Sequence, residues 1–395
     1  MSHVLIVGAS MGGLRTAEAL RRTGFEGSIT LLGAETEYPY NRPPLSKEYL
    51  LNPETKIHFN INSETLKSDV VLGTSVVRSD LKEQTVTTDK DTSHSFDYLV
   101  AATGLRSRSL KFENNVERNR FSLRTIRDTE NLRQALLKNK KVVILGAGFI
   151  GCELAASLTK LGCVVHVVAP EAIPLALALG DDFARVIQRH HEAQGVTFHM
   201  NSSVKDLIGE SQIQGVLLQD GRTLECDILI EAVGSITNVE WLSDNDLDLT
   251  HGLLLDSGLH ALTSNGSLSN VFGVGDMARF PYAQRDLPAR RIEHWNIPIE
   301  MAKRVAKDIC LQEGVQVDDF DRDVPFQPLA SFWSDQFDLH ILAYGELHLA
   351  NSSRLLDGDY DNEFVVGYYR DDELVGVAGL GMRGVLNKYR AEISI

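Results

Sequence analysis

Residues 141–151 read KVVILGAGFIG, and residues 4–13 read VLIVGASMGG. Each stretch runs from a short β-branched strand through a glycine turn into a helical pattern, and a second strand pattern follows at Val164–Val168 and Ser28–Leu32. The first glycines of the two copies lie 138 positions apart (146 minus 8), which is far too long a period for a solenoid. The sequence therefore predicts two βαβ units, each in its own nucleotide-binding domain of α/β class.

Composition and charge narrow the class of protein further. The chain has 395 residues, of which 43% are hydrophobic and 24% charged, with 31 Gly and 11 Pro, as in ordinary globular proteins of two or three domains. The formal charge is 39 minus 54, or -15, which disfavours nucleic acid or an anionic membrane surface as a partner.

The cysteines and the apolar runs indicate the compartment. Four cysteines show neither C-x-x-C nor zinc-like spacing, which favours a reducing compartment without disulfides and predicts no metal site. We see no apolar run of roughly 18 residues and no signal-peptide pattern. We expect a soluble, unprocessed, cytoplasmic protein.

Further patterns predict the remaining elements. The C-terminal part has aromatic and β-branched runs between Gly and Asp turns, which indicates an antiparallel sheet with a closing helix. Other strands are expected at Val70–Val77, Asp97–Ala102, Asp227–Val233 and Asn270–Gly273, and other helices at Asn131–Lys138 and Pro298–Ile309. The predicted domains are a discontinuous first dinucleotide-binding domain at 1–112 and 246–317, a second at 113–245, and a small α+β domain at 318–395.

The two glycine motifs differ in one place. Glycines allow the tight strand-to-helix turn and the close approach of backbone to pyrophosphate, while the helix N-terminus offers free N–H groups. The second copy, Gly146-x-Gly148-x-x-Gly151, is complete, whereas the first has Ser10 in the middle place. An ordinary strand-to-helix turn is the alternative for either copy taken alone.

A carboxylate at the end of the second strand commonly binds ribose hydroxyls in such domains. The first copy offers Glu35, for which a solvated loop acid is the alternative. The second copy has Ala169 at the expected place, and Glu171 is the candidate substitute.

Two other motifs carry a specific resemblance: RPPLSK at 42–47 and FWSDQ at 332–336. With the glycine turns, Ala102-Thr103-Gly104 and Gly273-Val274-Gly275-Asp276, they resemble the flavoprotein ferredoxin reductases that serve bacterial ring-hydroxylating dioxygenases and P450 systems. These are relatives of putidaredoxin and rubredoxin reductases. The resemblance covers nearly the whole chain.

The resemblance implies FAD in the first domain, a nicotinamide dinucleotide in the second, and a C-terminal domain beside the flavin. Asp276, at a strand end, suits the ribityl hydroxyls as an acceptor, with a helix N-cap as the alternative. The implied FAD residues are Gly8, Ser10, Gly12, Gly13, Ala34, Glu35, Arg42, Lys47, Val76, Thr103, Gly104, Arg124, Asp276 and Trp295.

Two residues are implied to act at the reacting centre. The resemblance puts Lys47 near the flavin N5 and pairs it with Glu153, which follows the second glycine turn. A surface lysine and a first-turn helix acid are the alternatives.

The choice of nicotinamide depends on the loop after the second strand of the second domain. Relatives usually carry Glu and, four positions later, Arg, where this chain has Ala169 and Ile173. The only basic residue between 162 and 182 is His166, so we expect NADH, with NADPH less favoured. The candidate nicotinamide-dinucleotide residues are Gly146, Gly148, Phe149, Ile150, Gly151, Glu171 and Gly234.

The implied activity is hydride transfer from NADH to FAD, followed by transfer of single electrons to an iron-sulfur ferredoxin that serves an oxygenase. Trp295 and Trp333 are candidates for shaping the flavin edge, with core packing as the alternative. A basic run is the candidate docking patch, with a solvated helix face as its alternative: Arg285, Arg290, Arg291, Lys303, Arg304 and Lys307.

Two other functions stay open. A disulfide or peroxide reductase of the same fold needs a redox-active thiol, but the first 151 residues contain no Cys, and Cys152 is better explained as a small packing residue. A flavoprotein resembling apoptosis-inducing factor would instead sense NADH and change its partner binding.

Overall fold

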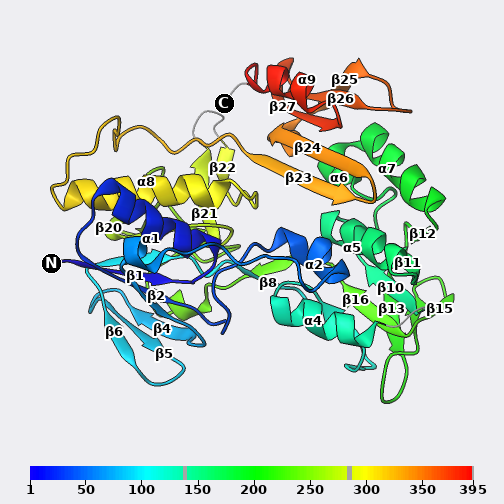
Figure 1. Cartoon of the computed structure of the whole chain (residues 1–395), viewed down its shortest axis with the longest axis horizontal. Helices are drawn as coiled ribbons and strands as arrows, with labels where there is room; N and C mark the ends of the chain where they lie inside the picture. The colour runs from blue at the N-terminus through cyan, green and yellow to red at the C-terminus, as the bar shows by residue number, and fades with distance from the viewer. Residues whose placement is uncertain (137–139, 283–286, 394–395) are drawn as a thin grey trace. The chain divides into compact units, whose positions relative to one another are not determined.

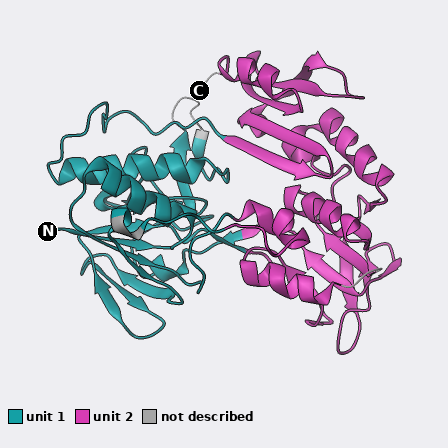
Figure 2. Cartoon of the chain, viewed as in Figure 1, with its two compact units in different colours: residues 1–41, 58–106, 236–330 teal, residues 42–57, 107–235, 331–395 magenta. Residues whose placement is uncertain are grey.

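A computed structural model describes residues 1–136, 140–282 and 287–393, which form two compact units. Unit 1 is Met1–Asn41, His58–Arg106 and Ile236–Ala330, and unit 2 is Arg42–Ile57, Ser107–Ser235 and Ser331–Ile395 (Figure 2). The chain passes between the units within β8 (Leu105–Ser107) and β17 (Ser235–Thr237), and again after residues 41, 57 and 330.

Unit 1 contains a six-stranded sheet in the order β19-β20-β7-β1-β2-β3. All its neighbouring strands are parallel except β19, which runs antiparallel to β20. Its strands are β1 (His3–Val7), β2 (Ser28–Leu32), β3 (Asp69–Val71), β7 (Tyr98–Ala101), β19 (His260–Thr263) and β20 (Gly266–Gly273).

Helices α1 (Met11–Thr23) and α8 (Ile297–Gln312) lie side by side on one face of this sheet (Figure 1). The apolar residues of α8 recur with helical spacing at Met301, Val305 and Ile309, and all three are buried in the core shared with the sheet. The rest of unit 1 consists of α3 (Ser63–Leu66), β4 (Val76–Asp80), β5 (Thr85–Thr88), β6 (Ser93–Ser95), η2 (Glu240–Leu242), β18 (Leu253–Leu254), β21 (Ala278–Tyr282) and β22 (Leu287–Arg290).

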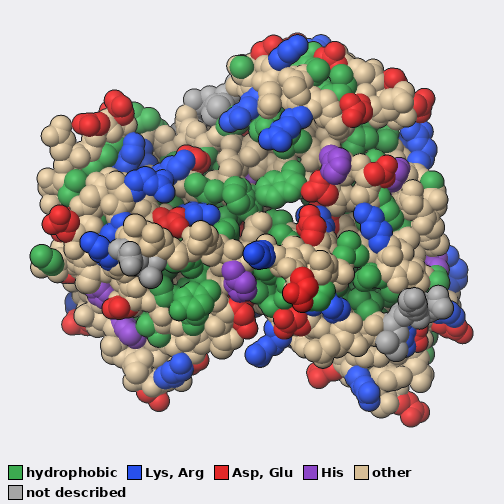
Figure 3. Space-filling model, in the orientation of Figure 1, with side chains coloured by type: hydrophobic (Ala, Val, Ile, Leu, Met, Phe, Trp, Pro, Cys, Tyr) green, Lys and Arg blue, Asp and Glu red, His purple; other side chains and the backbone are tan. Residues whose placement is uncertain are grey.

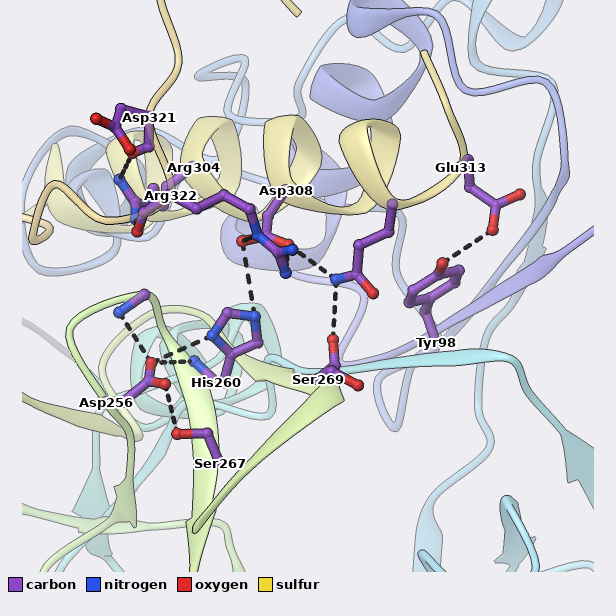
Figure 4. Close-up of polar contacts among 12 residues, drawn as sticks. Tyr98, Asp256, His260, Ser267, Ser269, Arg304, Asp308, Glu313, Asp321 and Arg322 are labelled. Atoms are coloured by element: carbon purple, nitrogen blue, oxygen red, sulfur yellow. Dashed lines mark hydrogen bonds and ion pairs between the residues drawn. The ribbon is translucent and has the colours of Figure 1, made fainter. Parts of the chain in front are cut away.

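A buried polar cluster ties α8 to the edge strand β19 (Figure 4). His260 on β19 lies 3.3 Å from the Asp256 carboxylate and 3.6 Å from that of Asp308 on α8, and Arg322 binds Asp308 at 2.8 Å. Burial by itself would lower the pKa of His260, but the two carboxylates outweigh it and raise the pKa to about 9. The fold of unit 1 therefore places the His260 imidazole between two carboxylates, which favour its protonated form.

Unit 2 contains a parallel five-stranded sheet in the order β12-β11-β10-β16-β9. Helix α5, which follows the second glycine turn, packs its Leu154 and Leu158 against Val165 and Val167 of β11. The elements of this part are η1 (Pro43–Ser46), α2 (Glu48–Leu51), β9 (Arg120–Ser122), α4 (Ile126–Ala135), β10 (Lys141–Leu145), α5 (Phe149–Lys160), β11 (Val164–Val168), α6 (Ala176–Leu179), α7 (Asp181–Ala193), β12 (Thr197–His199), β13 (Val204–Ile208), β14 (Gly215–Leu218), β15 (Thr223–Glu225) and β16 (Ile228–Glu231).

The end of the chain forms the predicted antiparallel sheet, in the order β23-β24-β27-β26-β25, with a closing helix. Phe183 and Ile187 of α7 share a buried cluster with Ile341, Val366 and Ala378 of this sheet. The elements are β23 (Ser331–Gln336), β24 (Leu339–Gly345), η4 (Leu347–Leu349), β25 (Ser352–Gly358), β26 (Phe364–Arg370), β27 (Glu373–Leu380) and α9 (Arg383–Arg390).

The predicted fold class, two βαβ dinucleotide folds with a C-terminal antiparallel sheet domain, is confirmed. The predicted strand Val70–Val77 is wrong, because a turn at Gly73, whose φ is +60°, separates β3 from β4. The helix predicted at Asn131–Lys138 begins earlier, at Ile126, where Thr125 and Asp128 form a capping box; residues 137–138 lie outside the described residues. The predicted domain boundaries stay predictions.

No helix in the described part of the chain is long and apolar enough to cross a membrane.

Candidate functional site

The first glycine turn lies at the edge of the sheet where several parallel strands of unit 1 end. Val7 pairs with Leu32 and with Ala101, and Ala101 pairs with Gly273. The residues that follow these four positions therefore gather at one edge, the place where α/β sheets bind ligands. They include these predicted FAD residues: Gly8, Ser10, Gly12, Gly13, Ala34, Glu35, Thr103, Gly104 and Asp276.

Two glycines of this turn are required by the backbone itself. A Cβ atom on Gly8, whose φ is +116°, would lie 2.1 Å from the Ala102 carbonyl oxygen, and one on Gly13 would lie 1.9 Å from that of Gly8. The first turn of α1 carries no acid, and Ser10 does not use its side chain to cap the helix. The helix N-terminus thus keeps the N–H groups and the dipole that suit a phosphate.

The loops around this turn are held by local hydrogen bonds. Tyr40 donates to the Glu35 carboxylate at 2.5 Å, so Glu35 is not simply a solvated loop acid. Asn238 donates to the Thr103 carbonyl at 3.1 Å and accepts from Thr103 Oγ1 through its own carbonyl at 2.5 Å. Sequence reasoning did not select Asn238, since no local motif relates it to a residue 135 positions away.

Asp276 has a distinct position, as do the two remaining predicted FAD residues of unit 1, Trp295 and Val76. Asp276 lies in the turn between β20 and β21, so it is not the N-cap of α8, which begins at Ile297. Trp295 donates to the Asn41 side chain at 3.1 Å, and Val76 begins β4.

Unit 2 contains the remaining predicted FAD residues, Arg42, Arg124 and Lys47. The Arg42 guanidinium donates to the Arg124 carbonyl at 2.6 Å, and the Arg124 N–H donates to the Asp128 carboxylate at 2.9 Å. The capping box of α4 thereby fixes the loop that carries Arg124.

Lys47 and Glu153 form a buried ion pair in unit 2, with 3.0 Å between Lys47 Nζ and Glu153 Oε1. Lys47 is 8% exposed and Glu153 4% exposed, so Lys47 is not the surface lysine of the alternative. The first turn of α5 carries no acid, so Glu153 is not a first-turn helix acid either. Glu153 also accepts from Ser46 at 2.5 Å and from Ser334 at 2.7 Å. Both serines lie in the specific motifs, yet nothing in the sequence indicated that they converge on Glu153.

Of the four glycines predicted to bind the nicotinamide dinucleotide, Gly146 and Gly151 are packed against backbone, whereas Gly148 and Gly234 are open. A Cβ atom would lie 2.3 Å from the Ala232 carbonyl oxygen at Gly146 and 2.1 Å from that of Gly146 at Gly151. A Cβ atom at Gly148 or Gly234 would meet nothing within 4 Å. The protein therefore needs no glycine for packing at Gly148, and the open backbone there suits the close approach of a pyrophosphate.

The loop after β11 carries Glu171, whose Oε2 is buried without a hydrogen-bond partner. Such an acceptor suits a ribose hydroxyl, because an unpaired buried oxygen is costly. Ala169 is fully buried and Ile173 is 4% exposed, so neither position presents a side chain to a ligand. Phe149 and Ile150 open α5, and Ile150 is 45% exposed.

His166 and His199 lie 3.1 Å apart on β11 and β12. Burial lowers the pKa of His166, with a smaller contribution from Lys141, and burial likewise lowers that of His199. The lowered pKa favours the neutral form of His166, the one basic residue of segment 162–182, at neutral pH.

The cysteines do not form a thiol redox centre. All four are buried, and Cys152 contacts the Ala147 carbonyl, while burial and then the Glu153 charge raise its pKa. A thiol that stays protonated is a poor nucleophile. Among the described residues, no group of three or more His, Cys, Asp or Glu side chains could hold a metal ion.

Two glycine turns, each where parallel strands of its own sheet end, are typical of proteins that bind two dinucleotides. Residues 2–302 match the pyridine nucleotide-disulphide oxidoreductase family, and residues 331–394 match the reductase C-terminal family. The chain belongs to the pyridine nucleotide-disulphide oxidoreductases and carries a reductase C-terminal domain, which confirms the resemblance. The family implies FAD and NAD(P)H as cofactors.

Similar proteins include ferredoxin and putidaredoxin reductases. The chain is 30% identical over 382 residues to a ferredoxin–NAD(P)(+) reductase of a Sphingomonas species, which covers 95% of this chain and 88% of that protein. It is 29% identical over 363 residues to the ferredoxin–NAD(+) reductase component of the p-cumate 2,3-dioxygenase system of Pseudomonas putida, covering 91% and 84%. The covalent putidaredoxin reductase–putidaredoxin complex matches with a TM-score of 0.90 at 26% identity, covering 99% of this chain and 92% of that chain.

Proposed function

We propose that the protein is an NADH-dependent flavoprotein reductase that passes single electrons to a ferredoxin serving an oxygenase. The observation that carries this proposal is the pair of glycine turns, each with an open helix N-terminus at the carboxyl edge of a parallel sheet. The relatives support the acceptor, because those named above reduce ferredoxins or putidaredoxin according to their names.

The first turn would hold the FAD pyrophosphate, and Glu35 would accept from the adenosine ribose. Asp276 would accept from the ribityl chain, since it follows the end of β20 and caps no described helix. Bound FAD would supply the exchange between two-electron and one-electron chemistry. The chain's part is to bind and orient the two dinucleotides and to set the charge around them.

Lys47 would hold a positive charge near the reacting edge, in the place that the resemblance gives it. Its ammonium stays fixed because Glu153 accepts from it and both groups are buried. A fixed cation favours a reduced, anionic ring system. Glu153, on α5 after the nicotinamide glycines, would orient the Lys47 ammonium through this pair.

NADH is the proposed donor. Glu171 has an acceptor without a hydrogen-bond partner for a ribose hydroxyl, and the only basic residue of the loop region, His166, has a lowered pKa. A 2'-phosphate would meet a carboxylate and no cation in that loop.

The predicted docking patch keeps fewer exposed cations than the sequence suggested. Arg291 pairs with Glu293 at 2.8 Å and Lys303 with Glu300 at 2.7 Å. Arg304 is partly buried, with its guanidinium 4.9 Å from the Phe320 ring, and Arg285 lies outside the described residues. We retain this surface of α8 as the proposed ferredoxin contact, with Lys307 as its principal test.

An anaerobic titration tests the proposal. The purified protein should show the visible spectrum of oxidised FAD, lose it on addition of NADH, and then reduce cytochrome c only when a ferredoxin is added. A colourless protein that FAD cannot reconstitute would overturn the proposal. Slow reduction that ends in a long-lived charge-transfer complex would instead identify an NADH sensor.

A further inference from the structure

A chain of hydrogen bonds extends from Glu153 into the interior of unit 2. Ser334 Oγ donates to Glu153 at 2.7 Å, Gln336 Nε2 donates to Ser334 Oγ at 3.0 Å, and Gln336 Oε1 lies 2.8 Å from His191 Nε2. Ser334, Gln336 and His191 are all fully buried. Glu153 lies on α5, Ser334 and Gln336 on the C-terminal strand β23, and His191 on helix α7 (Figure 1).

The donor and the acceptor of each hydrogen bond in this series can be assigned by starting from the Glu153 carboxylate. An ionised carboxylate only accepts, so the Ser334 hydroxyl must donate to Glu153 and its oxygen is left to accept. Gln336 therefore turns its NH₂ group toward Ser334 and its carbonyl oxygen toward His191. The His191 Nε2 must then carry a proton, which leaves Nδ1 as the lone-pair nitrogen.

The surroundings of His191 agree with a neutral ring in that tautomer. Burial lowers the pKa of His191 to about 4, and its Nδ1 has no hydrogen-bond partner. The rings of Phe198 and Phe337 lie 5.9 Å and 5.0 Å from the imidazole. The series of hydrogen bonds therefore ends at a neutral His191 imidazole, which donates one hydrogen bond through Nε2.

Strand β23 has polar residues on the face where a core strand normally has apolar ones. Ser334 and Gln336 alternate with Trp333, which is 37% exposed, and Asp335, which is half-buried and bonds His340. Buried polar side chains are costly unless every one is paired, and this pair is satisfied only through Glu153 and His191. The arrangement is therefore specific to holding the carboxylate.

We propose that Ser334 and Gln336 are positioning residues for Glu153, and that His191 fixes the amide of Gln336 in the orientation this requires. Through them, the C-terminal sheet sets where the Glu153 carboxylate lies against Lys47. The proposal rests on the proposed function, because the Lys47–Glu153 pair matters to catalysis only if it faces the flavin.

A double-mutant cycle tests it on the flavin-loaded protein. Two substitutions, Gln336→Met and Ser334→Ala, are each made in the parent and in a Glu153→Gln background. Gln336→Met keeps the side-chain volume and removes both hydrogen bonds of the side-chain amide. The readouts are the midpoint potential of bound FAD, the rate constant for its reduction by NADH, and the KM for NADH. Asp335→Asn, on the other face of the same strand, is the matched control.

Each substitution should slow flavin reduction by roughly 3- to 10-fold and shift the midpoint potential, with little change in KM. In the Glu153→Gln background the same substitutions should change the rate by less than about twofold and leave the potential unshifted. Asp335→Asn should behave as the parent does in both backgrounds.

Equal effects in both backgrounds, or no effect in the parent, would overturn the positioning role. If Gln336→Met does not fold, Ser334→Ala decides alone, since it removes one hydroxyl and leaves the apolar contacts. A protein that binds no FAD would refute the proposed function instead, so the two failures are distinguishable. Ser334→Thr, which retains the hydroxyl, should recover most of the parent's rate.

Discussion

At the scale of single residues, the unpaired acceptor of Glu171 predicts how the nicotinamide dinucleotide is held. Glu171→Ala should raise the KM for NADH about 5- to 10-fold with kcat nearly unchanged, because a hydrogen bond worth about 1 kcal/mol is lost equally from ground and transition states. Steady-state kinetics with NADH and NADPH and a small artificial acceptor would measure this. An unchanged KM would show that another group binds the ribose.

The structure also changes which substitutions are useful in that loop. An acid at position 169 or an arginine at position 173, as relatives carry, would be inserted at a buried position in this chain. Glu171 is therefore the residue at which donor preference should be altered.

The buried ion pair allows a second test with single residues. Lys47→Met leaves the Glu153 charge buried with hydroxyl donors only, which typically costs about 3 to 5 kcal/mol. The apparent Tm should fall and reduction by NADH should slow. Adding Glu153→Gln should recover much of the Tm but not the rate, as thermal unfolding and stopped-flow reduction would show. A Tm insensitive to Lys47→Met would mean that the pair contributes nothing to stability.

At the scale of elements, substitutions at two glycines of the second turn should distinguish an effect on folding from an effect on NADH binding. Gly146→Ala should destabilise the protein, since its Cβ would lie 2.3 Å from the Ala232 carbonyl oxygen at a φ of +99°. Gly148→Ala should fold as the parent does, because its Cβ meets nothing within 4 Å, yet bind NADH more weakly by crowding the phosphate. Thermal unfolding and NADH titration of the two variants measure this, and equal losses of stability would contradict it.

The contact between α8 and β19 predicts a pH dependence of stability. The pKa of His260 is raised from about 6.5 to about 9, so the folded state binds the proton more tightly than the unfolded chain. The stabilisation is full below about pH 6.5 and is lost as pH rises through about 9. Urea unfolding of the parent between pH 6 and 10 should therefore show falling stability.

His260→Gln supplies the control for this pH dependence. The variant should be less stable at pH 6 and should lose less stability between pH 6 and 10 than the parent does. The pKa of Asp256 in the same cluster is lowered to about 2 from about 3.8: burial would raise it, but hydrogen bonds from His260 and Ser267 outweigh burial. Its contribution is present above about pH 3.8 and lost as pH falls through about 2.

At the scale of the molecule, the net charge of -15 bears on how an acidic ferredoxin could dock. Acidic and basic side chains are interspersed on the face drawn in Figure 3. Bulk repulsion must therefore be overcome by a local contact, and exposed charges lose range as the Debye length falls below roughly 10 Å. Ferredoxin reduction should slow as salt rises, while reduction by NADH should change less.

Lys307→Glu should raise the KM for ferredoxin several-fold and leave reduction of a small neutral acceptor intact. Lys82→Glu, an exposed lysine in the β4–β5 turn, is the control with the same change of charge. If both variants behave alike, docking depends on net charge and not on α8. Arg304 is a poorer test, because it donates to the carbonyls of Asp321 and Arg322, so its loss would also disturb local structure.

The two βαβ units could be predicted from the amino-acid sequence, because strand, glycine turn and helix are local patterns of a few residues. Local patterns also decided the antiparallel C-terminal sheet. Local patterns gave a wrong strand at Val70–Val77, because the apolar residues there continue across the turn at Gly73. They also placed the start of α4 too late, because its capping box, and not its apolar spacing, fixes where the helix begins. Helix and strand limits depend on such turn and cap contacts as much as on hydrophobic periodicity.

The surroundings of Glu153 could not be predicted from the sequence and became visible only in the folded protein. Its hydrogen-bond partners are 106, 107 and 181 positions away in the chain, so no spacing rule relates them. Burial could not be predicted from the sequence either: relatives carry charged residues at positions 169 and 173, but Ala169 and Ile173 are buried in this structure. A side chain's neighbours and its access to solvent are set by the packing of distant segments, and those properties give a carboxylate, a lysine or a buried histidine its role.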